Sequence, residues 1–566
     1  MSFKIRNIIS VVVLTLMFTG CKDFLDKNPD MRATIDSKEK VQLLLVSAYQ
    51  DCNYGMMCEL SSDNMIDNNT PDEQGLIHNE ESFDRSDDEC FAWEPIISSQ
   101  AQDSPYSVWN GCYFGIATAN NALEAIAKLE SQGIDMSAEK AEAKLVRAYY
   151  HFVLANVFCM PYRDDELSKQ NMGMYYMEKP ETVVKANYNR GNLTELYDNI
   201  QRDIEEALPY VSDKYYSVPK YHFNEKAAYA FAARFYLFRR NWTRVLECAN
   251  RVLGTDDAAT ALQLVNSDYI RNTSSDIESE LNYWIDASQN SNLLIIPVMS
   301  YSGLRYASYL RYGWNRDARS CMITNGGPCW SGEFPGFTIW QVRNGTFGSL
   351  ISKCYWKWNI TNKVQGIGYM YNFRREFTTN ETLLCRAEAK IFLNDIEGAV
   401  SDMNLWAKSY DAGKGEMQVL AADRIRSFFA SGRNTQYVPT LHNEDISPDF
   451  VVTDEQRPFV HCVLHFRRIE TIHDGMRWFD IKRYGIEVTH LLGNETSYPT
   501  EKFLKWDDDR RAIQIPQDVI VSNSGIEANP RTNVGDHNPV LYFAPQQRSV
   551  AELIAAKSSN AITKKN

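Results

Sequence analysis

The sequence lacks the signatures of several large classes of proteins. It has no surplus of basic residues, because 59 Lys and Arg stand against 73 Asp and Glu, for a formal charge of −14. Phosphate recognition needs clustered Lys and Arg, so this balance argues against nucleic acids and other polyanions as ligands, but not against neutral ones. The glycine patterns of Rossmann and P-loop nucleotide sites are missing, as is the HExxH motif of zinc proteases. Catalysis of those types has no support in the sequence.

Long apolar runs are also lacking, except at the N-terminus. There a basic start leads into apolar residues 8–18, which are too few to span a bilayer comfortably, and then into Thr19, Gly20 and Cys21. Small residues before a cysteine resemble the lipobox of bacterial lipoproteins. The signal peptide is then residues 1–20, and the thiol of Cys21 is the site of lipidation. An ordinary secretory signal is the alternative. An acyl anchor tethers a protein to a membrane without spanning it.

Cysteines and aromatic residues are present in number, with 12 Cys, 31 Tyr and 12 Trp. The cysteines in apolar helical patterns are predicted to be buried small hydrophobic side chains: Cys112, Cys159, Cys248, Cys385 and Cys462. Others lie in irregular segments. Because an exported chain meets an oxidising compartment, a disulfide can form between Cys321 and Cys329, and another among Cys52, Cys58 and Cys90; free thiols are the alternative.

The clearest helical pattern lies in residues 224–253. Small and aromatic side chains form two stripes at helical spacing, and a second amphipathic helix begins after Asn241. The same pattern recurs in residues 381–406, where Asp395 corresponds to Asn241 with an offset of 154 residues. These are helical hairpins of the tetratricopeptide type, in which neither helix can bury its apolar face alone. Two copies so far apart predict a scaffold with a large insertion rather than a continuous solenoid.

The predicted fold is therefore mainly α: a tetratricopeptide-like hairpin scaffold with a loop-rich insertion of short strands. We expect a single domain, residues 21–566, with the scaffold at about 37–253 and 379–490 and a ligand-binding insertion at about 255–370. In the insertion, helical periodicity fades and Gly, Ser, Asn and aromatic residues take over. Residues 139–158 carry two apolar stripes, which predicts a central helix covered on two sides.

Three stretches together resemble the RagB/SusD family of nutrient-binding outer-membrane lipoproteins. They are CKDFLD at residues 21–26, EAKLVRAYYHFVLANVF at 142–158, and the segment 470–485 that contains DGMRWFDIKR. The acidic start is also similar to the surface-export tag of Bacteroidetes lipoproteins. The match follows the family's order along nearly the whole chain. One departure is residues 159–161, Cys-Met-Pro, where the family prefers Gly-Asp-x-Pro.

The resemblance implies a SusD-like fold and a non-enzymatic lipoprotein at the cell surface. It further implies that the protein captures oligosaccharides or polysaccharides and delivers them to a SusC-like TonB-dependent transporter in the outer membrane. Some members of the family handle peptides. A surface glycoside hydrolase and a scaffold that binds only proteins are the alternatives from other classes.

A sugar ring has an apolar face edged by hydroxyls, so a binding site needs flat aromatic side chains together with amides and charged groups. Two regions offer both, and the ligand-binding candidates in them are Trp93, Trp109, Asn68, Trp284, Tyr301, Tyr312, Trp314 and Trp330. The alternative is that each aromatic ring packs in the insertion's own core. Trp242 and Trp478 lie on helical faces and are predicted to be core residues.

No catalytic residue, metal site or cofactor is predicted. His461 and His465 have a helical spacing that a metal can use, but packed or surface histidines are the preferred interpretation. The acidic run from Asp84 to Glu89 could bind a structural calcium ion. It lacks the Gly-centred spacing of an EF-hand, which favours a solvated loop.

Overall fold

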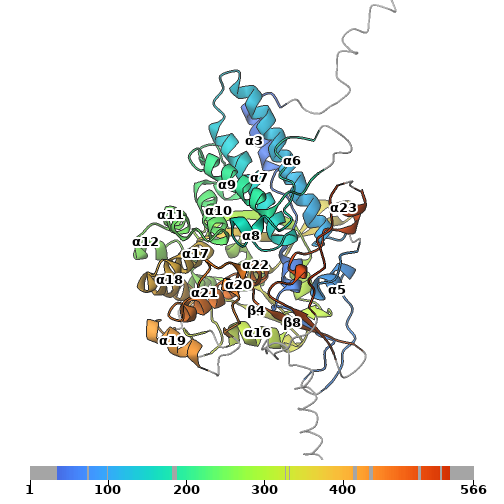
Figure 1. Cartoon of the computed structure of the whole chain (residues 1–566), viewed down its shortest axis with the longest axis vertical. Helices are drawn as coiled ribbons and strands as arrows, with labels where there is room; N and C mark the ends of the chain where they lie inside the picture. Colours follow the sequence, from blue (N-terminus) through green and yellow to red (C-terminus); the bar gives the residue numbers. More distant parts are fainter. Residues whose placement is uncertain are drawn as a thin grey trace, which may run out of the picture.

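Helices are the dominant secondary structure, and the strands are few and short (Figure 1). This computed structural model describes residues 35–535 except for residues 73–74, 98–99, 182–187, 325–326, 331, 412–416, 432–436, 495–498 and 523–524. The predicted signal peptide and Cys21 lie outside the described residues.

Four helices form the N-terminal part of the scaffold: α3 (Lys38–Val46), α6 (Pro105–Glu130), α7 (Ser137–Phe158) and α9 (Leu193–Ala207). Helix α7 packs against both α6 and α9 and is buried along most of its length. It is therefore the central helix that its two apolar stripes predicted. A small second core of aliphatic side chains holds α3 against α6 and α7.

The start of α9 depends on a reciprocal cap. The Asn192 side chain accepts the Glu195 N–H at 2.9 Å, and the Glu195 carboxylate accepts the Asn192 N–H at 3.4 Å. We expect Asn192→Ala to lower the free energy of unfolding by about 1 kcal/mol, because the Glu195 N–H loses its side-chain acceptor. Urea denaturation measures this change. Asn199→Ala on the same helix is the control, and equal losses in the two variants would contradict a capping role.

Both predicted hairpins are present, and they are neighbours in space although 154 residues separate them in the sequence. Helix α11 of the first packs against α17 of the second, and Trp242 stacks on Phe392 across this contact with ring centroids 4.2 Å apart. The four helices are α10 (Glu225–Phe238), α11 (Trp242–Leu253), α17 (Thr379–Phe392) and α18 (Ile396–Ser409).

The turns of the two hairpins have the same construction. The backbone is left-handed at Arg240, with φ of 57°, and at Asn394, with φ of 63°. The next residue, Asn241 or Asp395, caps the second helix by accepting the N–H three residues further on. The repeat seen in the sequence is thus a repeat of backbone geometry.

A three-stranded antiparallel sheet anchors the insertion to the scaffold. Its order is β2-β7-β6, with β2 at Asn292–Met299, β7 at Ile367–Thr378 and β6 at Lys357–Asn362. Strand β7 runs directly into α17. Phe377, near the end of β7, pairs with Leu294 and has its ring 5.7 Å from that of Phe231 in α10. The end of the sheet is therefore part of the scaffold core.

The C-terminal helices α21 (Arg457–Glu470) and α22 (Met476–Tyr484) are buried on all sides. The residue before α22 is Gly475, with φ of 81°. A Cβ at Gly475 would lie 2.8 Å from the Cα of Gly55, so only glycine permits this approach. The charged residues of both helices are buried, except Arg457 at the start of α21.

The remaining elements are short. The other helices are α4 (Gly55–Ser61), α5 (Arg85–Phe91), α8 (Asp165–Ser168), α12 (Asp257–Ala261), α13 (Ser267–Thr273), α14 (Ile277–Trp284), α15 (Ser302–Tyr306), α16 (Arg316–Arg319), α19 (Ala422–Ala430), α20 (Asn443–Ile446) and α23 (Gln517–Ser522). The other strands are β1 (Ile66–Asp67), β3 (Tyr312–Gly313), β4 (Ile339–Val342), β5 (Gly348–Ile351), β8 (Val488–Leu492) and β9 (Thr500–Leu504). Single turns of 3-10 or π helix are η1 (Pro219–Tyr221), η2 (Ser320–Thr324), η3 (Arg343–Gly345), η4 (Ser352–Cys354) and η6 (Asp509–Arg511).

The cysteines of the described residues are free thiols. The helical ones are buried, as predicted, and Cys52, Cys58 and Cys90 form no bridge with one another. Cys329 is also unbridged, and the side chain of Cys321 lies outside the described part of the chain. The possible disulfide among the first three is therefore corrected: these thiols are packing groups.

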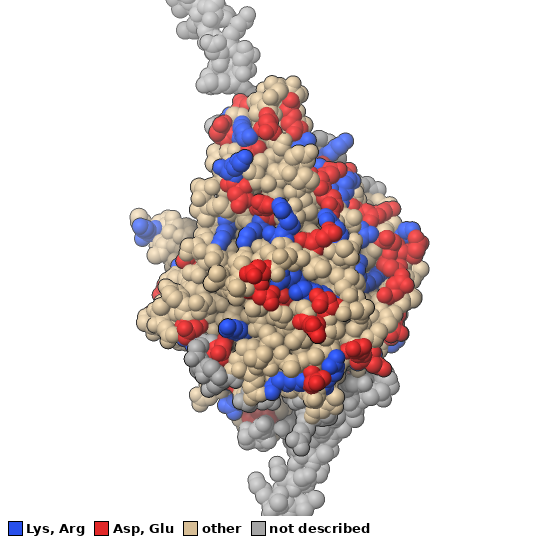
Figure 2. Space-filling view, turned by 90° about the vertical axis from the view of Figure 1, so that its left-hand side faces the viewer, with Lys and Arg blue, Asp and Glu red and all other residues tan. Residues whose placement is uncertain are grey.

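The distribution of surface charge and the apolarity of the helices bear on which partners the protein can have. Figure 2 shows acidic and basic side chains interspersed over one face of the molecule, without a continuous patch of one sign. Among the helices of the described residues, none is both long and apolar enough to cross a bilayer.

Candidate functional site

The two regions expected to bind the ligand meet in the structure. Strand β1 of the first region pairs antiparallel with β3 of the second. Arg311 donates to the Asp67 carboxylate at 2.9 Å, and the Asn68 amide donates to the carbonyls of Leu310 and Phe347. These bonds close the joint between the regions with buried polar groups.

Most of the ligand-binding candidates are packed inside the protein. The almost fully buried ones are Asn68, Trp93, Trp109, Trp284, Tyr312, Trp314 and Trp330. Tyr301 is half-buried. The expectation that these rings present open faces is corrected for the indoles of the joint, because other side chains cover them. A large apolar ring contributes most when it is removed from water.

The buried rings have specific partners. Trp93 donates from Nε1 to the Ser61 carbonyl at 2.9 Å and stacks on His490 at 4.2 Å. Trp284 donates to the Ser352 hydroxyl at 3.1 Å. The Tyr312 hydroxyl donates to Asp88 at 2.7 Å. These contacts make the rings supports of the fold.

Tyr301 stands at the surface with another aromatic residue. Its ring lies 5.6 Å from that of Phe83, which is 40% exposed. The guanidinium of Arg305 lies 5.0 Å from the centroid of the Phe83 ring. This small aromatic surface keeps Tyr301 a candidate for contact with a sugar.

The acidic run forms a helix start instead of a loop. Asp84 caps α5, Asp87 closes the capping box and pairs with the buried Arg305, and Asp88 pairs with Arg311 at 3.2 Å. The prediction of a solvated loop is therefore wrong. Because these carboxylates bind protein donors, the described residues here leave no open set of oxygen ligands for calcium.

The paired histidines of α21 are packed side chains, as predicted. Burial lowers the pKa of His461 to about 4 and that of His465 to about 3, so both rings are neutral. The His465 ring lies 4.6 Å from that of Tyr437. Within the described residues, no group of three or more His, Cys, Asp or Glu is arranged to hold a metal ion.

A cavity of about 210 Å³ lies beside α6, away from the joint. Its wall comes from α6, from the segments 174–181 and 188–190 and from Ile526, which follows α23. Four aromatic rings and two charged groups line it: Trp109, Tyr113, Tyr175, Tyr188, Glu181 and Arg190. Here aromatic and polar groups of the described residues surround an empty volume large enough for a sugar ring.

The aromatic rings of this cavity form two pairs. Trp109 and Tyr113 are one helical turn apart on α6, with ring centroids 5.0 Å apart. Tyr175 and Tyr188 lie 4.8 Å apart on the opposite segment. Burial raises the pKa of Tyr113, so its hydroxyl remains a hydrogen-bond donor. Burial and the hydrogen bond to Glu181 raise the pKa of Tyr188.

Of the predicted ligand residues, the cavity brings in Trp109 alone. Its neighbour Tyr113 had a detectable signal, because Trp109, Tyr113 and Ala117 recur every four residues on one face of α6. Tyr175 and Tyr188 had none, because their segment has no periodicity and their pairing is made by the tertiary fold.

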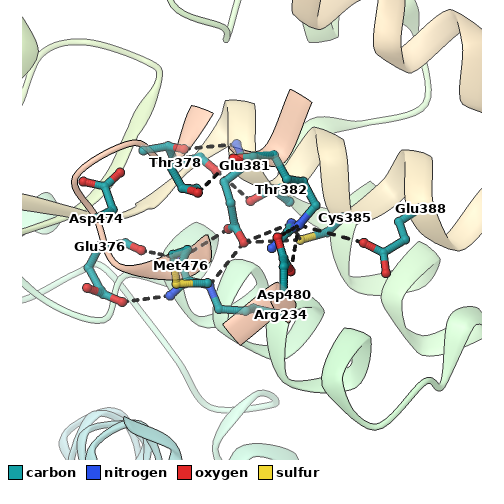
Figure 3. A network of polar contacts seen from close by, with 12 residues as sticks. Arg234, Glu376, Thr378, Glu381, Thr382, Cys385, Glu388, Asp474, Met476 and Asp480 are labelled. Atoms are coloured by element: carbon teal, nitrogen blue, oxygen red, sulfur yellow. Dashed lines mark hydrogen bonds and ion pairs between the residues drawn. The ribbon is translucent and has the colours of Figure 1, made fainter. Parts of the chain in front are cut away.

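A second group of polar residues lies where the insertion returns to the scaffold (Figure 3). Arg234 of α10 donates to Glu376 of β7 at 2.8 Å and to Glu381 of α17 at 3.2 Å. Burial alone would raise the pKa of Glu376, but the charges of Arg374 and Arg234 lower it. One arginine thus ties the last strand of the insertion to the second hairpin.

The network continues into the C-terminal helices. Arg467 donates to Asp480 at 3.1 Å, and Arg483 donates to Glu388 at 2.8 Å and to Asp480 at 2.7 Å. The empty space beside the network is about 20 Å³, which accommodates about one water molecule. The network therefore holds the helices and strand β7 together, and the space beside it is too small for a ligand.

Comparison with known proteins supports the fold and the class. Residues 23–237 match the family model SusD-like_3, described as starch-binding associating with outer membrane. A SusD superfamily protein from Bacteroides vulgatus ATCC 8482 has a TM-score of 0.56 and 18% identity, over 87% of this chain and 97% of that one. No curated protein matches the chain.

Two further solved structures agree. A SusD superfamily protein from Bacteroides thetaiotaomicron VPI-5482 has a TM-score of 0.55 at 17% identity, over 87% of this chain and 99% of that one. A protein from Bacteroides vulgatus ATCC 8482, described as a candidate sugar-binding protein, has a TM-score of 0.55 at 16% identity, over 89% of this chain and 100% of that one. The class is thus a helical SusD-like protein with small sheets. Residues 23–237 of the chain match the SusD-like family model, and the solved SusD superfamily structures share its fold.

Proposed function

We propose that this protein captures carbohydrate at the bacterial surface and passes it to a SusC-like TonB-dependent transporter in the outer membrane. In this proposal the acylated Cys21 anchors it as a surface lipoprotein. The observation that carries the proposal is the aromatic cavity beside α6. The family description, carbohydrate binding in association with the outer membrane, supports it.

The chemistry of the cavity suits a sugar ring. Tyr175 is 39% exposed and offers a ring to the apolar face of a pyranose, while Trp109 and Tyr113 close the inner side. Tyrosine hydroxyls and the Arg190 guanidinium supply polar groups for the edge of the ring. The volume, about 210 Å³, is below the roughly 300–1,000 Å³ of sites for drug-sized ligands. One sugar ring therefore enters, and the rest of a chain lies outside.

The cavity favours binding over hydrolysis. Glycoside hydrolases use two carboxyl groups about 5–10 Å apart. The described wall of the cavity contains one carboxylate, Glu181, and that group accepts a hydrogen bond from Tyr188. We therefore propose a binding protein that releases no reducing ends from any glycan it retains. Release of reducing ends by the purified protein would favour the hydrolase instead.

The Tyr175→Ala variant is expected to weaken binding to a retained glycan by about 1 kcal/mol, or roughly five- to tenfold in Kd, because one stacking face is lost. Affinity electrophoresis on a polysaccharide panel identifies the glycan, and calorimetry measures the Kd. Tyr210→Ala removes a tyrosine that is 59% exposed and lies outside the cavity wall, and it serves as the control. Normal binding by Tyr175→Ala together with loss in Tyr301→Ala would move the site to the surface of Tyr301 and Phe83.

The transporter partner is tested separately. We expect extraction of the protein from native membranes in mild detergent to recover a TonB-dependent barrel with it, in stoichiometric amount. Recovery of the lipoprotein alone, with glycan binding intact, would remove the transporter from the proposal and leave carbohydrate capture.

A further inference from the structure

Arg190 is a buried cation in the wall of the aromatic cavity, and only 4% of it is exposed. Its Nε donates to the Gly173 carbonyl at 2.8 Å, and its Nη1 donates to the Glu527 carbonyl at 2.9 Å. Its Nη2 has no hydrogen-bond partner among the described residues, and no described carboxylate lies within ion-pair distance of it. The guanidinium therefore lies in the wall of the cavity without a carboxylate partner among the described residues, and its Nη2 lacks an acceptor there.

The other buried arginines of the described residues have carboxylate partners or donate from all three side-chain nitrogens. Arg147 pairs with Asp203 at 2.6 Å, and Arg386 pairs with Asp402 at 2.7 Å. Arg511 lacks a carboxylate, but its three side-chain nitrogens all donate to backbone carbonyls. Burying a charge is costly unless it is paired and fully hydrogen-bonded. Arg190 meets neither condition, which points to a group that arrives from outside.

We propose that the cavity binds a sugar that carries a carboxylate, such as a uronic acid at the end of an oligosaccharide. The carboxylate pairs with Arg190, and the ring lies against Tyr175 and Trp109. This inference rests on the proposed function, since it names the class of glycan for the same site. A charge-assisted hydrogen bond in a cavity with little water is stronger than a neutral one.

Size and charge narrow the ligand further. A uronic acid differs from a hexose by a carboxylate in place of a hydroxymethyl group, so it fits where a hexose fits, whereas a sulfate ester adds bulk to a cavity of about 210 Å³. The net charge of −14 and the carboxylate of Glu181 in the wall both oppose a polyanion. A single terminal uronic acid fits the small volume and carries only one negative charge, whereas a polyuronate carries many.

The test compares two ligands on the full-length protein by calorimetry. One is a disaccharide with a terminal glucuronic acid, and the other is the same disaccharide with that carboxyl group reduced to a hydroxymethyl group. We expect the acid to bind at least about tenfold more tightly, as a charge-assisted hydrogen bond predicts. The preference should disappear in Arg190→Gln. It should grow about threefold in Glu181→Gln, because an opposing surface charge is removed.

Each outcome decides a different point. If Arg190→Gln fails to fold, the ratio of the two ligands in the parent protein and in Glu181→Gln still gives the answer. Equal binding of acid and alcohol would overturn carboxylate recognition and leave carbohydrate capture standing, and preference for a sulfated sugar would replace the ligand class. Retention of no glycan, with binding of a peptide through its C-terminal carboxylate, would overturn both proposals.

Discussion

Replacing Trp314 with alanine is expected to lower the free energy of unfolding by about 3–5 kcal/mol, the range for large aromatic side chains removed from a core. Trp314 is fully buried, and its ring meets that of His473 edge-on at 4.9 Å. It directly follows strand β3, so it lies under the joint between the two regions. The alanine variant leaves a cavity there that the paired strands cannot fill. Thermal and urea unfolding measure the loss.

Two further variants isolate the cause. Trp314→Phe keeps most of the volume and removes an indole N–H that has no partner among the described residues, so we expect a loss below about 1.5 kcal/mol. Trp358→Ala makes the same change at a ring that is 54% exposed on strand β6, and a change within about 0.5 kcal/mol is expected. If Trp314→Ala were as stable as Trp358→Ala and lost glycan binding, Trp314 would be a binding platform and not a core residue.

This contrast shows what the sequence can and cannot predict. The hairpins were predictable because their apolar residues recur at helical spacing and their capping residues, Asn241 and Asp395, occupy equivalent positions. Periodicity also identified α7 as central. Each of these inferences depends on contacts within one element or between two adjacent elements, so local pattern is sufficient.

The indoles of the insertion had no such pattern. Trp314 and Trp330 follow short strands or lie in loops. In such segments the backbone path determines whether a ring points inward, and that path depends on contacts with segments far away in the sequence. The short helices α4 and α5 were missed for a related reason, because seven residues are too few to display a helical period. Exposure is a property of the tertiary fold.

The cavity beside α6 could not be predicted from local sequence pattern either. Tyr188 and Arg190 belong to a connecting segment, and they reach Trp109 only after the chain has passed along α7 and returned. Arg190 is distinguished by two features together: among the described residues it has no carboxylate partner, and its Nη2 has no hydrogen-bond acceptor. Composition cannot reveal either feature. Sites built from connections between helices therefore need the structure.

Arg467→Met is expected to lower the free energy of unfolding by about 3–5 kcal/mol, because it removes one member of a buried ion network and leaves carboxylates uncompensated. Arg467 is fully buried, donates to Asp480 at 3.1 Å and lies 3.6 Å from Glu381. Burial alone would raise the pKa of Asp480, but Arg467 and Arg483 lower it. Loss of Arg467 leaves that carboxylate with one arginine partner. Arg251→Met, at an exposed ion pair with Glu225, is the control and should cost less than about 1 kcal/mol.

A double-mutant cycle separates the network from simple packing. Asp480→Asn in the Arg467→Met background removes the uncompensated charge, so the double variant should be more stable than the sum of the two single losses predicts, by about 1–3 kcal/mol. Strict additivity would mean that Arg467 acts through its volume alone. The distinction matters for function because Arg467 and Arg234 both approach Glu381, at the point where β7 enters α17. If the charges hold this point, weakening them loosens the insertion as a unit, and proteolysis should then cut within residues 255–370 before it cuts the hairpins.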